Sequence, residues 1–125
     1  MGMGAPLRSC DVATAAARLS ADDGAGRPLI VDVRERDEFA TVRVPGAVLV
    51  PLSEFAARYE ELPRDRPLLV MCAAGKRSLV AADHLARHGY GDVTNVAGGI
   101  IAWHAAGLPV ASGPPAPGEG ELPKG

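Results

Sequence analysis

The sequence predicts an α/β fold with a mainly parallel central sheet and helices on both faces of that sheet. Short apolar or β-branched runs alternate with segments of helical periodicity, which is the pattern of strands joined by helices. The strand-like runs are apolar at nearly every position, as expected for strands covered on both sides. A chain of 125 residues, 47% of them hydrophobic, is enough for one packed domain. We expect that domain to span residues 9–110 and to follow a flexible N-terminus, residues 1–8.

The first part of the domain is expected to form one helix and two strands. Ser9 is a candidate N-cap for a helix whose apolar residues recur at 3.6-residue spacing and which stops near Asp22. Residues 29–33 form a β-branched run, which predicts a buried strand. The turn at Pro45-Gly46 leads to a second such run at residues 47–50.

Two further helices with a strand between them are expected next. Ser53 can cap a helix that Pro63 ends, because proline interrupts the hydrogen bonds of a helix interior. Residues 68–71 predict a third strand, which runs directly into the loop at residues 72–78. The following helix is expected to have Gly89 as its C′ residue and to turn four residues inward: Leu79, Ala82, Leu85 and Ala86.

The last regular elements expected are a strand at residues 92–96 and a short helix at residues 100–106. The periodic pattern then ends. Residues 111–125 are rich in proline and glycine and contain one large apolar residue, Leu122. Because so little apolar surface is available for burial, we expect this tail to be disordered.

The composition argues against several classes of partner and location. The formal net charge is -2, which gives no general attraction for nucleic acid or an anionic membrane. No apolar run approaches the roughly 18 residues of a membrane span, and the N-terminal residues lack the pattern of a signal peptide. Two cysteines, Cys10 and Cys72, cannot form a disulfide scaffold. We therefore expect a cytoplasmic protein, and the abundance of Ala, Gly, Arg and Pro suggests a GC-rich bacterial genome.

The loop at residues 72–78 is the segment most suggestive of chemistry. Cys72 lies at the carboxyl end of a predicted strand and just before a helix, which is where open α/β sheets bind ligands. Gly75 permits a positive φ, so the backbone can turn successive N–H groups toward the sulfur. Such a cradle favours an anion, as does the dipole of the helix behind it. We expect Cys72 to be largely thiolate at neutral pH.

The residues at the end of the loop extend this interpretation. Lys76 and Arg77 add positive charge at the rim, and a guanidinium can hold a sulfonate or phosphate through two parallel hydrogen bonds. Ser78 can donate one more hydrogen bond or cap the helix. The three histidines of the chain lie on predicted helices away from the loop, so nothing supports a Cys-His acyl-transfer dyad. A loop that stabilises a sulfur anion without a base suits sulfur transfer through a persulfide, which needs no metal or organic cofactor.

Four segments in a fixed order carry a family likeness. They are residues 29–35 (Leu-Ile-Val-Asp-Val-Arg-Glu), 44–47 (Val-Pro-Gly-Ala), 72–78 (Cys-Ala-Ala-Gly-Lys-Arg-Ser) and 98–103 (Gly-Gly-Ile-Ile-Ala-Trp) with 106–110 (Ala-Gly-Leu-Pro-Val). Together they resemble the rhodanese-like domain family over roughly Ser9 to Val110. The resemblance implies a single rhodanese-like domain with a persulfide-forming Cys72. It also implies a substrate pocket walled by the backbone of five residues: Ala73, Ala74, Gly75, Lys76 and Arg77.

The same resemblance implies the substrates. They are a sulfane donor such as thiosulfate and a thiophilic acceptor such as cyanide or a cellular thiol. Four residues separate Cys72 from Arg77, as in the sulfurtransferases, whereas the related cell-cycle phosphatases have five between the corresponding residues. The shorter loop favours sulfur over phosphate.

The chain departs from the family pattern at two places. Many members have an arginine immediately after the cysteine, where this chain has Ala73, which removes a cation from the loop. Members also commonly have Gly-His where this chain has Val42-Arg43, so Arg43 either restores charge near the site or solvates the surface. Asp32 and Arg34 are expected to fix the end of the first strand by hydrogen bonds and charge pairing, and Cys10 to be incidental.

These observations leave three functional hypotheses, led by a sulfurtransferase that uses Cys72 as a sulfur carrier. Its partners are a small-molecule sulfur donor and acceptor, with a sulfur-accepting protein as a further possibility, and neither nucleic acid nor a membrane. The second hypothesis is a catalytically weak binding or sulfur-relay module that acts on a protein partner, which Ala73 and the expected disordered tail suggest. The third, a phosphatase or arsenate reductase, depends on the anion cradle alone.

Overall fold

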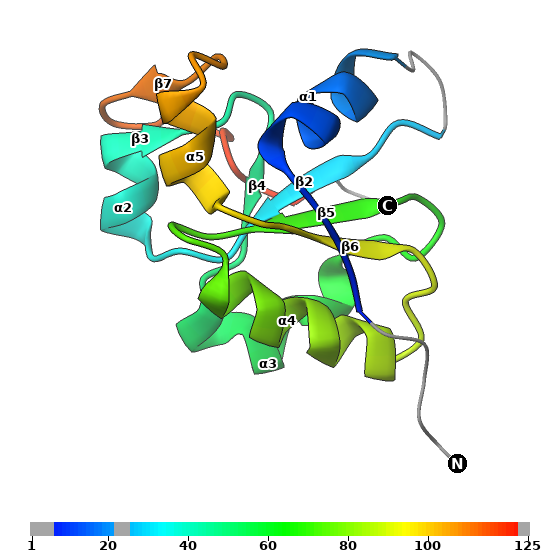
Figure 1. The fold of residues 1–125 in the computed structure, drawn as a ribbon. Helices are drawn as coiled ribbons and strands as arrows, with labels where there is room; N and C mark the ends of the chain where they lie inside the picture. The colour runs from blue at the N-terminus through cyan, green and yellow to red at the C-terminus, as the bar shows by residue number, and fades with distance from the viewer. Residues whose placement is uncertain (1–6, 22–25, 123–125) are drawn as a thin grey trace.

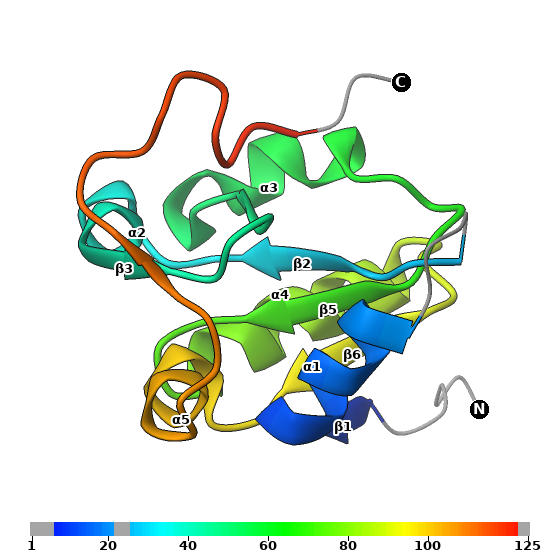
Figure 2. The same ribbon diagram turned by 90° about the horizontal axis from the view of Figure 1, so that it is seen from above.

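A computed structural model describes residues 7–21 and 26–122, which form a five-stranded parallel sheet with helices on both faces (Figures 1 and 2). The strands are β1 (Arg8–Cys10), β2 (Leu29–Asp32), β4 (Val48–Leu49), β5 (Leu68–Met71) and β6 (Val93–Val96). Their order across the sheet is β1-β6-β5-β2-β4, and every neighbouring pair is parallel. The predicted α/β class with a mainly parallel sheet is therefore confirmed.

The helices form two layers. On one face of the sheet lie α1 (Val12–Ala21) and α5 (Gly99–Ala105), and on the other lie α3 (Phe55–Arg58) and α4 (Lys76–Arg87) (Figure 1). Short 3-10 turns, η1 (Leu52–Glu54) and η2 (Tyr59–Glu61), flank α3. In the part of the chain that the structure describes, none of the helices has the length and apolar character needed to cross a membrane.

A smaller unit lies beyond the carboxyl ends of β2 and β5 (Figure 2). It consists of α2 (Arg36–Thr41), β3 (Val42–Arg43) and β7 (Ala111–Ser112), with β3 and β7 paired antiparallel. The sequence reading missed α2, which begins with a reciprocal capping box between Glu35 and Glu38. A six-residue helix has too few turns to show a clear apolar periodicity.

Side chains along the central strands alternate between two apolar clusters, one on each face of the sheet. Leu68, Val70 and Cys72 belong to the cluster under α3 and α4, whereas Leu69 and Met71 belong to the cluster under α1 and α5. This is the twofold alternation of an extended strand, and it explains why nearly every strand residue is apolar. The alternation also decides that the side chain of Cys72 lies on the face that α4 covers.

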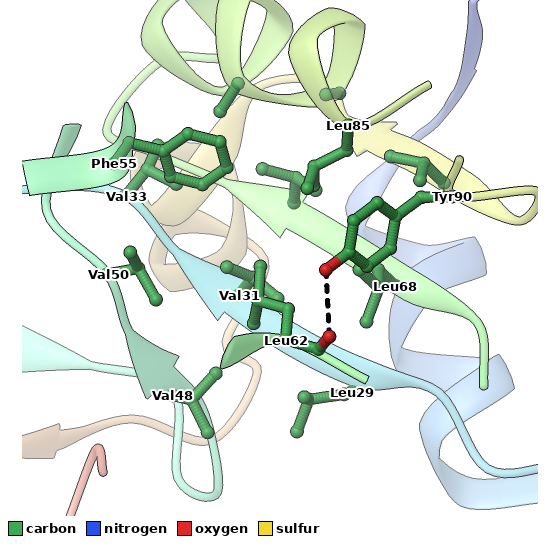
Figure 3. Close-up of a cluster of buried hydrophobic side chains, with 14 of the residues drawn as sticks. Leu29, Val31, Val33, Val48, Val50, Phe55, Leu62, Leu68, Leu85 and Tyr90 are labelled. Atoms are coloured by element: carbon green, nitrogen blue, oxygen red, sulfur yellow. Dashed lines mark hydrogen bonds between the residues drawn. The ribbon is translucent and has the colours of Figure 1, made fainter. Parts of the chain in front are cut away.

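The cluster under α3 and α4 shows how that face is closed (Figure 3). Phe55 from α3 and Leu85 from α4 pack over the strands, and both are buried. Tyr90 fills the far end of the cluster, where its hydroxyl donates a hydrogen bond of 2.9 Å to the carbonyl oxygen of Leu62. Because the buried hydroxyl has a partner, the tyrosine adds apolar contact without an unsatisfied polar atom.

Two details of the helices differ from the sequence-based expectation. The backbone N–H of Thr14 donates to the side chain of Asp11 at 2.8 Å, so Asp11 caps α1, while Ser9 lies in β1, a strand that the sequence reading missed. Leu79 is 45% exposed, and Ala86 is exposed too, so both were wrongly expected to face inward. The buried stripe of α4 (Lys76–Arg87) is instead formed by Ser78, Ala81, Ala82 and Leu85, which share one face at helical spacing.

The C-terminal segment, which the sequence predicts to be disordered, packs along the domain in this structure over residues 111–122. The backbone N–H of Leu49 in β4 donates to the carbonyl oxygen of Gly120 at 2.7 Å, and Leu122 packs against the apolar cluster under α3 and α4. Arg43 is only 4% exposed, and its guanidinium binds the carboxylate of Glu119 and the carbonyl oxygen of Gly113. A buried guanidinium and an unpaired strand edge both need partners, and this segment supplies them. Residues 1–6 and 123–125, at the outer ends of the expected flexible regions, lie outside the described residues.

This packing predicts that the C-terminal segment stabilises the domain. Deleting residues 111–125 should lower the midpoint of thermal unfolding by roughly 3–6 °C or more, because it removes the partners of Arg43 and uncovers the edge of β4. Circular dichroism melts of the two chains provide the measurement. An unchanged midpoint would mean that the segment contributes nothing to the folded state.

Candidate functional site

The sulfur of Cys72 lies where β5 ends, between the sheet and the first turn of α4. The residue is almost completely buried, with 1% of its surface exposed. Two donors lie within hydrogen-bond distance of Sγ: the backbone N–H of Gly75 at 3.1 Å and the hydroxyl of Ser78 at 3.3 Å. Both donors come from the loop and the helix that follow, so a local turn of the chain surrounds the sulfur with hydrogen-bond donors.

Gly75 provides the turn that makes this arrangement possible. Its φ is +99°, in the left-handed region that residues with a side chain rarely adopt, and it is the N-cap of α4. This conformation directs its N–H at Sγ and starts the helix with its N-terminal end toward the sulfur. A Cβ at this position would also lie 3.2 Å from the backbone nitrogen of Gly98. The geometry expected of Gly75 from the sequence is therefore present.

The first turn of α5 holds the other side of the loop. The backbone N–H of Ile100 donates to the carbonyl oxygen of Cys72 at 2.9 Å, and that of Ile101 donates to the carbonyl oxygen of Ala73 at 3.1 Å. Gly99 makes this approach possible, because a Cβ there would lie 2.3 Å from the Cys72 carbonyl oxygen. With the loop carbonyls bound to α5, the loop N–H groups are left to face the sulfur.

These donors favour the thiolate form of Cys72. Burial by itself raises the pKa of the thiol, but the Ser78 hydroxyl and the backbone N–H groups of Ser78, Gly75 and Ala74 lower it further than burial raises it. The net pKa lies below that of an ordinary cysteine. Cys10 shows the opposite behaviour, because burial raises the pKa of its thiol in spite of the nearby charge of Arg18. The two cysteines therefore differ in the property that controls reactivity.

Asn95 is a member of the site that the sequence reading missed. Its side-chain oxygen lies 2.6 Å from the Ser78 hydroxyl, and its amide nitrogen lies 3.5 Å from the carbonyl oxygen of Gly75. Both Asn95 and Ser78 are buried. The hydroxyl has one proton, so it can donate to Asn95 or to the sulfur, but not fully to both. The signal in the sequence was a pair of polar residues, Thr94 and Asn95, between the two valines of the short strand β6.

Arg77 is turned toward α2 and forms an ion pair there. Its two terminal nitrogens donate to the two carboxylate oxygens of Glu38 at 2.7 and 2.8 Å. The sequence predicts Arg77 to be an open anion-binding group at the rim. Its pairing with Glu38 has no local signal in the sequence, because the two positions are 39 apart in the chain. Lys76 is exposed at the start of α4. In the loop before it, Ala73 is half-buried and Ala74 is exposed.

Asp32 and Arg34 lie at the end of β2 as a buried pair, as their sequence positions suggested. The guanidinium of Arg34 donates to the Asp32 carboxylate, at 2.8 Å for the shortest contact, and to the carbonyl oxygen of Val42 at 2.7 Å. Arg43 neither adds charge to the loop nor solvates the surface, because it is buried against the C-terminal segment. Over residues 7–21 and 26–122, no three His, Cys, Asp or Glu side chains are grouped so that they could hold a metal ion.

The geometry predicts that Ser78 tunes the reactivity of the sulfur. In a Cys10→Ser background, Ser78→Ala should move the pH midpoint of Cys72 alkylation by iodoacetamide to higher pH. The reason is that the variant removes a hydrogen bond to the thiolate, and the fraction of thiolate at a given pH falls as its pKa rises. If the midpoints of the two proteins coincide, the hydroxyl donates to Asn95 alone.

The close packing of Gly99 against the backbone of Cys72 leads to a second prediction. Gly99→Ala should slow the alkylation of Cys72 at neutral pH by at least about tenfold, since the added Cβ forces the loop away from α5 and disorders the N–H groups around the sulfur. Gly107→Ala is the matched control, because Gly107 also has a positive φ, +75°, but an added Cβ there meets no atom within 4 Å. That control should lose about 1 kcal/mol of stability and keep the reactivity of Cys72. Equal effects of the two substitutions would disprove the role assigned to the contact.

Comparison with known proteins finds one matching family model and several similar sequences. The family model described as "Rhodanese-like domain" matches residues 13–106. A protein of Allochromatium vinosum named "Sulfurtransferase" is 42% identical over 82 residues, which are 66% of this chain and 77% of that protein. The Vibrio cholerae protein named "Thiosulfate sulfurtransferase GlpE" is 35% identical over 81 residues, which are 65% of this chain and 76% of that protein.

Solved structures agree with the sequence comparisons. The crystal structure of a rhodanese-related protein from Thermoplasma volcanium aligns with a TM-score of 0.75 and 31% sequence identity, covering 83% of this chain and 97% of that one. The family match covers most of the chain and includes Cys72, the loop after it and the first turn of α5. The chain belongs to the rhodanese-like domain family and resembles its sulfurtransferases.

Proposed function

We propose that this protein transfers sulfane sulfur from a donor such as thiosulfate to a thiophilic acceptor through a persulfide on Cys72. The observation that carries the proposal is the set of donors around Sγ, the N–H of Gly75 and the hydroxyl of Ser78, at the N-terminal end of α4. Such an environment stabilises a thiolate, which is the nucleophilic form of cysteine.

The first half of the reaction loads the sulfur. The Cys72 thiolate attacks the outer sulfur of thiosulfate and forms a new S–S bond. The S–S bond of thiosulfate breaks, and sulfite leaves with its electron pair. The negative charge of the enzyme then resides on the terminal sulfur of the persulfide, one atom further from the Cα of Cys72. The N–H groups of the loop continue to stabilise that charge without a proton transfer, so no general base is required.

The second half returns the enzyme to its starting state. Cyanide or a thiolate attacks the terminal sulfur, the S–S bond of the persulfide breaks, and the Cys72 thiolate leaves with the electron pair. The products are thiocyanate or a new persulfide, according to the acceptor. A low pKa of the Cys72 thiol makes it a good leaving group, so the same hydrogen bonds assist both halves.

Thiosulfate is supported as a donor by the name of the Vibrio cholerae relative and by the size of the loop. Four residues between Cys72 and Arg77 leave a smaller ring than the five of the related phosphatases, and Arg77 is occupied by Glu38. Both features argue against the hypothesis of a phosphatase or arsenate reductase, which would need room and an open guanidinium for a tetrahedral oxyanion. We also expect a cytoplasmic location, because a persulfide cycle needs a reducing compartment for its free thiol.

A second candidate function is a sulfur relay to a protein partner with little turnover of small molecules. The observations that favour it are Ala73, which leaves the loop without a cation after the cysteine, and the 1% exposure of Cys72. The C-terminal segment no longer supports this candidate, because residues 111–122 are packed along the domain. Small donors and acceptors that turn over at rates typical of enzymes would dispose of this second function.

Intact-mass measurement tests the proposal directly. After incubation with thiosulfate and removal of excess donor, the protein should gain the mass of one sulfur atom, which addition of cyanide should remove with formation of thiocyanate. Cys72→Ser should abolish the gain, whereas Cys10→Ser should retain it, because Cys10 has a raised thiol pKa and lies in β1. An unchanged mass of the wild-type protein with several sulfane donors would refute the sulfurtransferase.

A further inference from the structure

Glu38 is the residue outside the loop that acts most directly on the charges around Cys72. It lies on α2, and its carboxylate accepts hydrogen bonds from both terminal nitrogens of Arg77. One of its oxygens also accepts the backbone N–H of Glu35 at 3.0 Å, as part of the capping box of α2. Each oxygen of the carboxylate is thus engaged, and the side chain is fixed from two directions.

The position of Glu38 is itself supported by a buried ion pair. Arg34, which is held by the carboxylate of Asp32, also donates to the backbone carbonyl oxygen of Glu38 at 3.3 Å. The end of β2 therefore anchors α2, and α2 presents its carboxylate to the first turn of α4. This connection runs from the sheet to Arg77 without passing through the loop.

The ion pair changes the electrostatics of the site. Arg77 is close enough to Cys72 for the thiolate to raise the pKa of the guanidinium, after the larger contribution of the hydrogen bonds to Glu38. The Arg77 hydrogen bonds also lower the pKa of Glu38 to about 2, from its usual 4.5. Because a lowered pKa keeps a carboxyl ionised down to that value, Glu38 carries its negative charge throughout the neutral range. An anion that approaches the sulfur therefore meets a compensated pair rather than a free cation.

We propose that Glu38 determines donor specificity by holding Arg77 and masking its charge, so that the site disfavours doubly charged donors relative to singly charged ones. This inference deepens the proposed sulfur transfer and rests on it. Ala73 acts in the same direction, because it leaves no second cation beside the cysteine. Among the cations of the loop, Lys76 is then the one that attracts the donor, from an exposed position.

The test is Glu38→Gln, which removes the charge and keeps an oxygen that can accept the N–H of Glu35, since glutamine also fits a capping box. The donors to compare are thiosulfate, with two negative charges, and benzenethiosulfonate, with one. Releasing Arg77 should lower the KM for thiosulfate about two- to fivefold, lower that for benzenethiosulfonate less, and leave kcat within about twofold. Because the released charge is partly exposed, the gain should shrink as salt is added.

Glu54→Gln is the matched control. Like Glu38, Glu54 forms an ion pair with an arginine, in its case Arg36 of α2. The pKa of Glu54 is likewise lowered to about 2, and its side chain is 34% exposed, against 33% for Glu38. It makes no contact with Arg77 among the described interactions. The control should therefore leave both KM values unchanged. Glu38→Asp, which keeps the charge, should hold the KM for thiosulfate closer to the wild-type value than Glu38→Gln does.

The outcomes separate this inference from the proposed function. If the wild-type protein turns over thiosulfate and Glu38→Gln leaves or raises its KM, the charge-masking role is wrong while sulfur transfer stands. If no donor loads the wild-type protein, sulfur transfer is wrong, and protection of Cys72 from iodoacetamide by sulfate still reports the charge at the site. Sulfate should protect Glu38→Gln at lower concentration than wild type, and equal protection would overturn the inference.

Discussion

The orientation of the peptide groups after Cys72 is the constraint on which the rest of the site depends. An amide has its N–H and C=O on opposite sides, so a loop that aims N–H groups at a sulfur must place its carbonyls outward, where they need partners. The first turn of α5 supplies those partners through Ile100 and Ile101, at 2.9 and 3.1 Å. Gly99 allows the close approach and Gly75 the reversal of the chain. Two helices that point their N-terminal ends at one loop thus produce a buried sulfur with a lowered pKa.

The sheet fixes where this loop lies. Because side chains alternate along β5, Cys72 continues the face covered by α4, and the helix that follows the loop packs on that same face. The side chain of Cys72 therefore packs in the apolar cluster under α3 and α4, while its sulfur accepts hydrogen bonds from Gly75 and Ser78. Burial strengthens those hydrogen bonds and at the same time opposes the charge that they stabilise, so the pKa of Cys72 is lowered because the donors together outweigh burial.

Ion pairs of both short and long sequence separation connect the smaller unit to its surroundings. Asp32 and Arg34 join the end of β2 to the backbone of α2, and Glu38 joins α2 to the first turn of α4. Arg43 joins β3 to the C-terminal segment. Each arginine is held by a carboxylate and, for the two most buried ones, by carbonyl oxygens as well, which is what a guanidinium removed from water requires. The charges of the site are consequently set by residues far apart in the chain.

The sequence by itself determined the fold class, the order of the main strands and helices, the cysteine at a strand end and the need for a glycine after it. These features depend on local pattern: apolar periodicity, turn residues and the spacing within one loop. Only the tertiary structure decided that Glu38 neutralises Arg77, that Asn95 binds Ser78, and that Arg43 holds the C-terminal segment rather than the substrate. The physical reason is that a charge or a buried polar group is satisfied by whatever residue the fold brings beside it. Sequence distance carries no information about that partner.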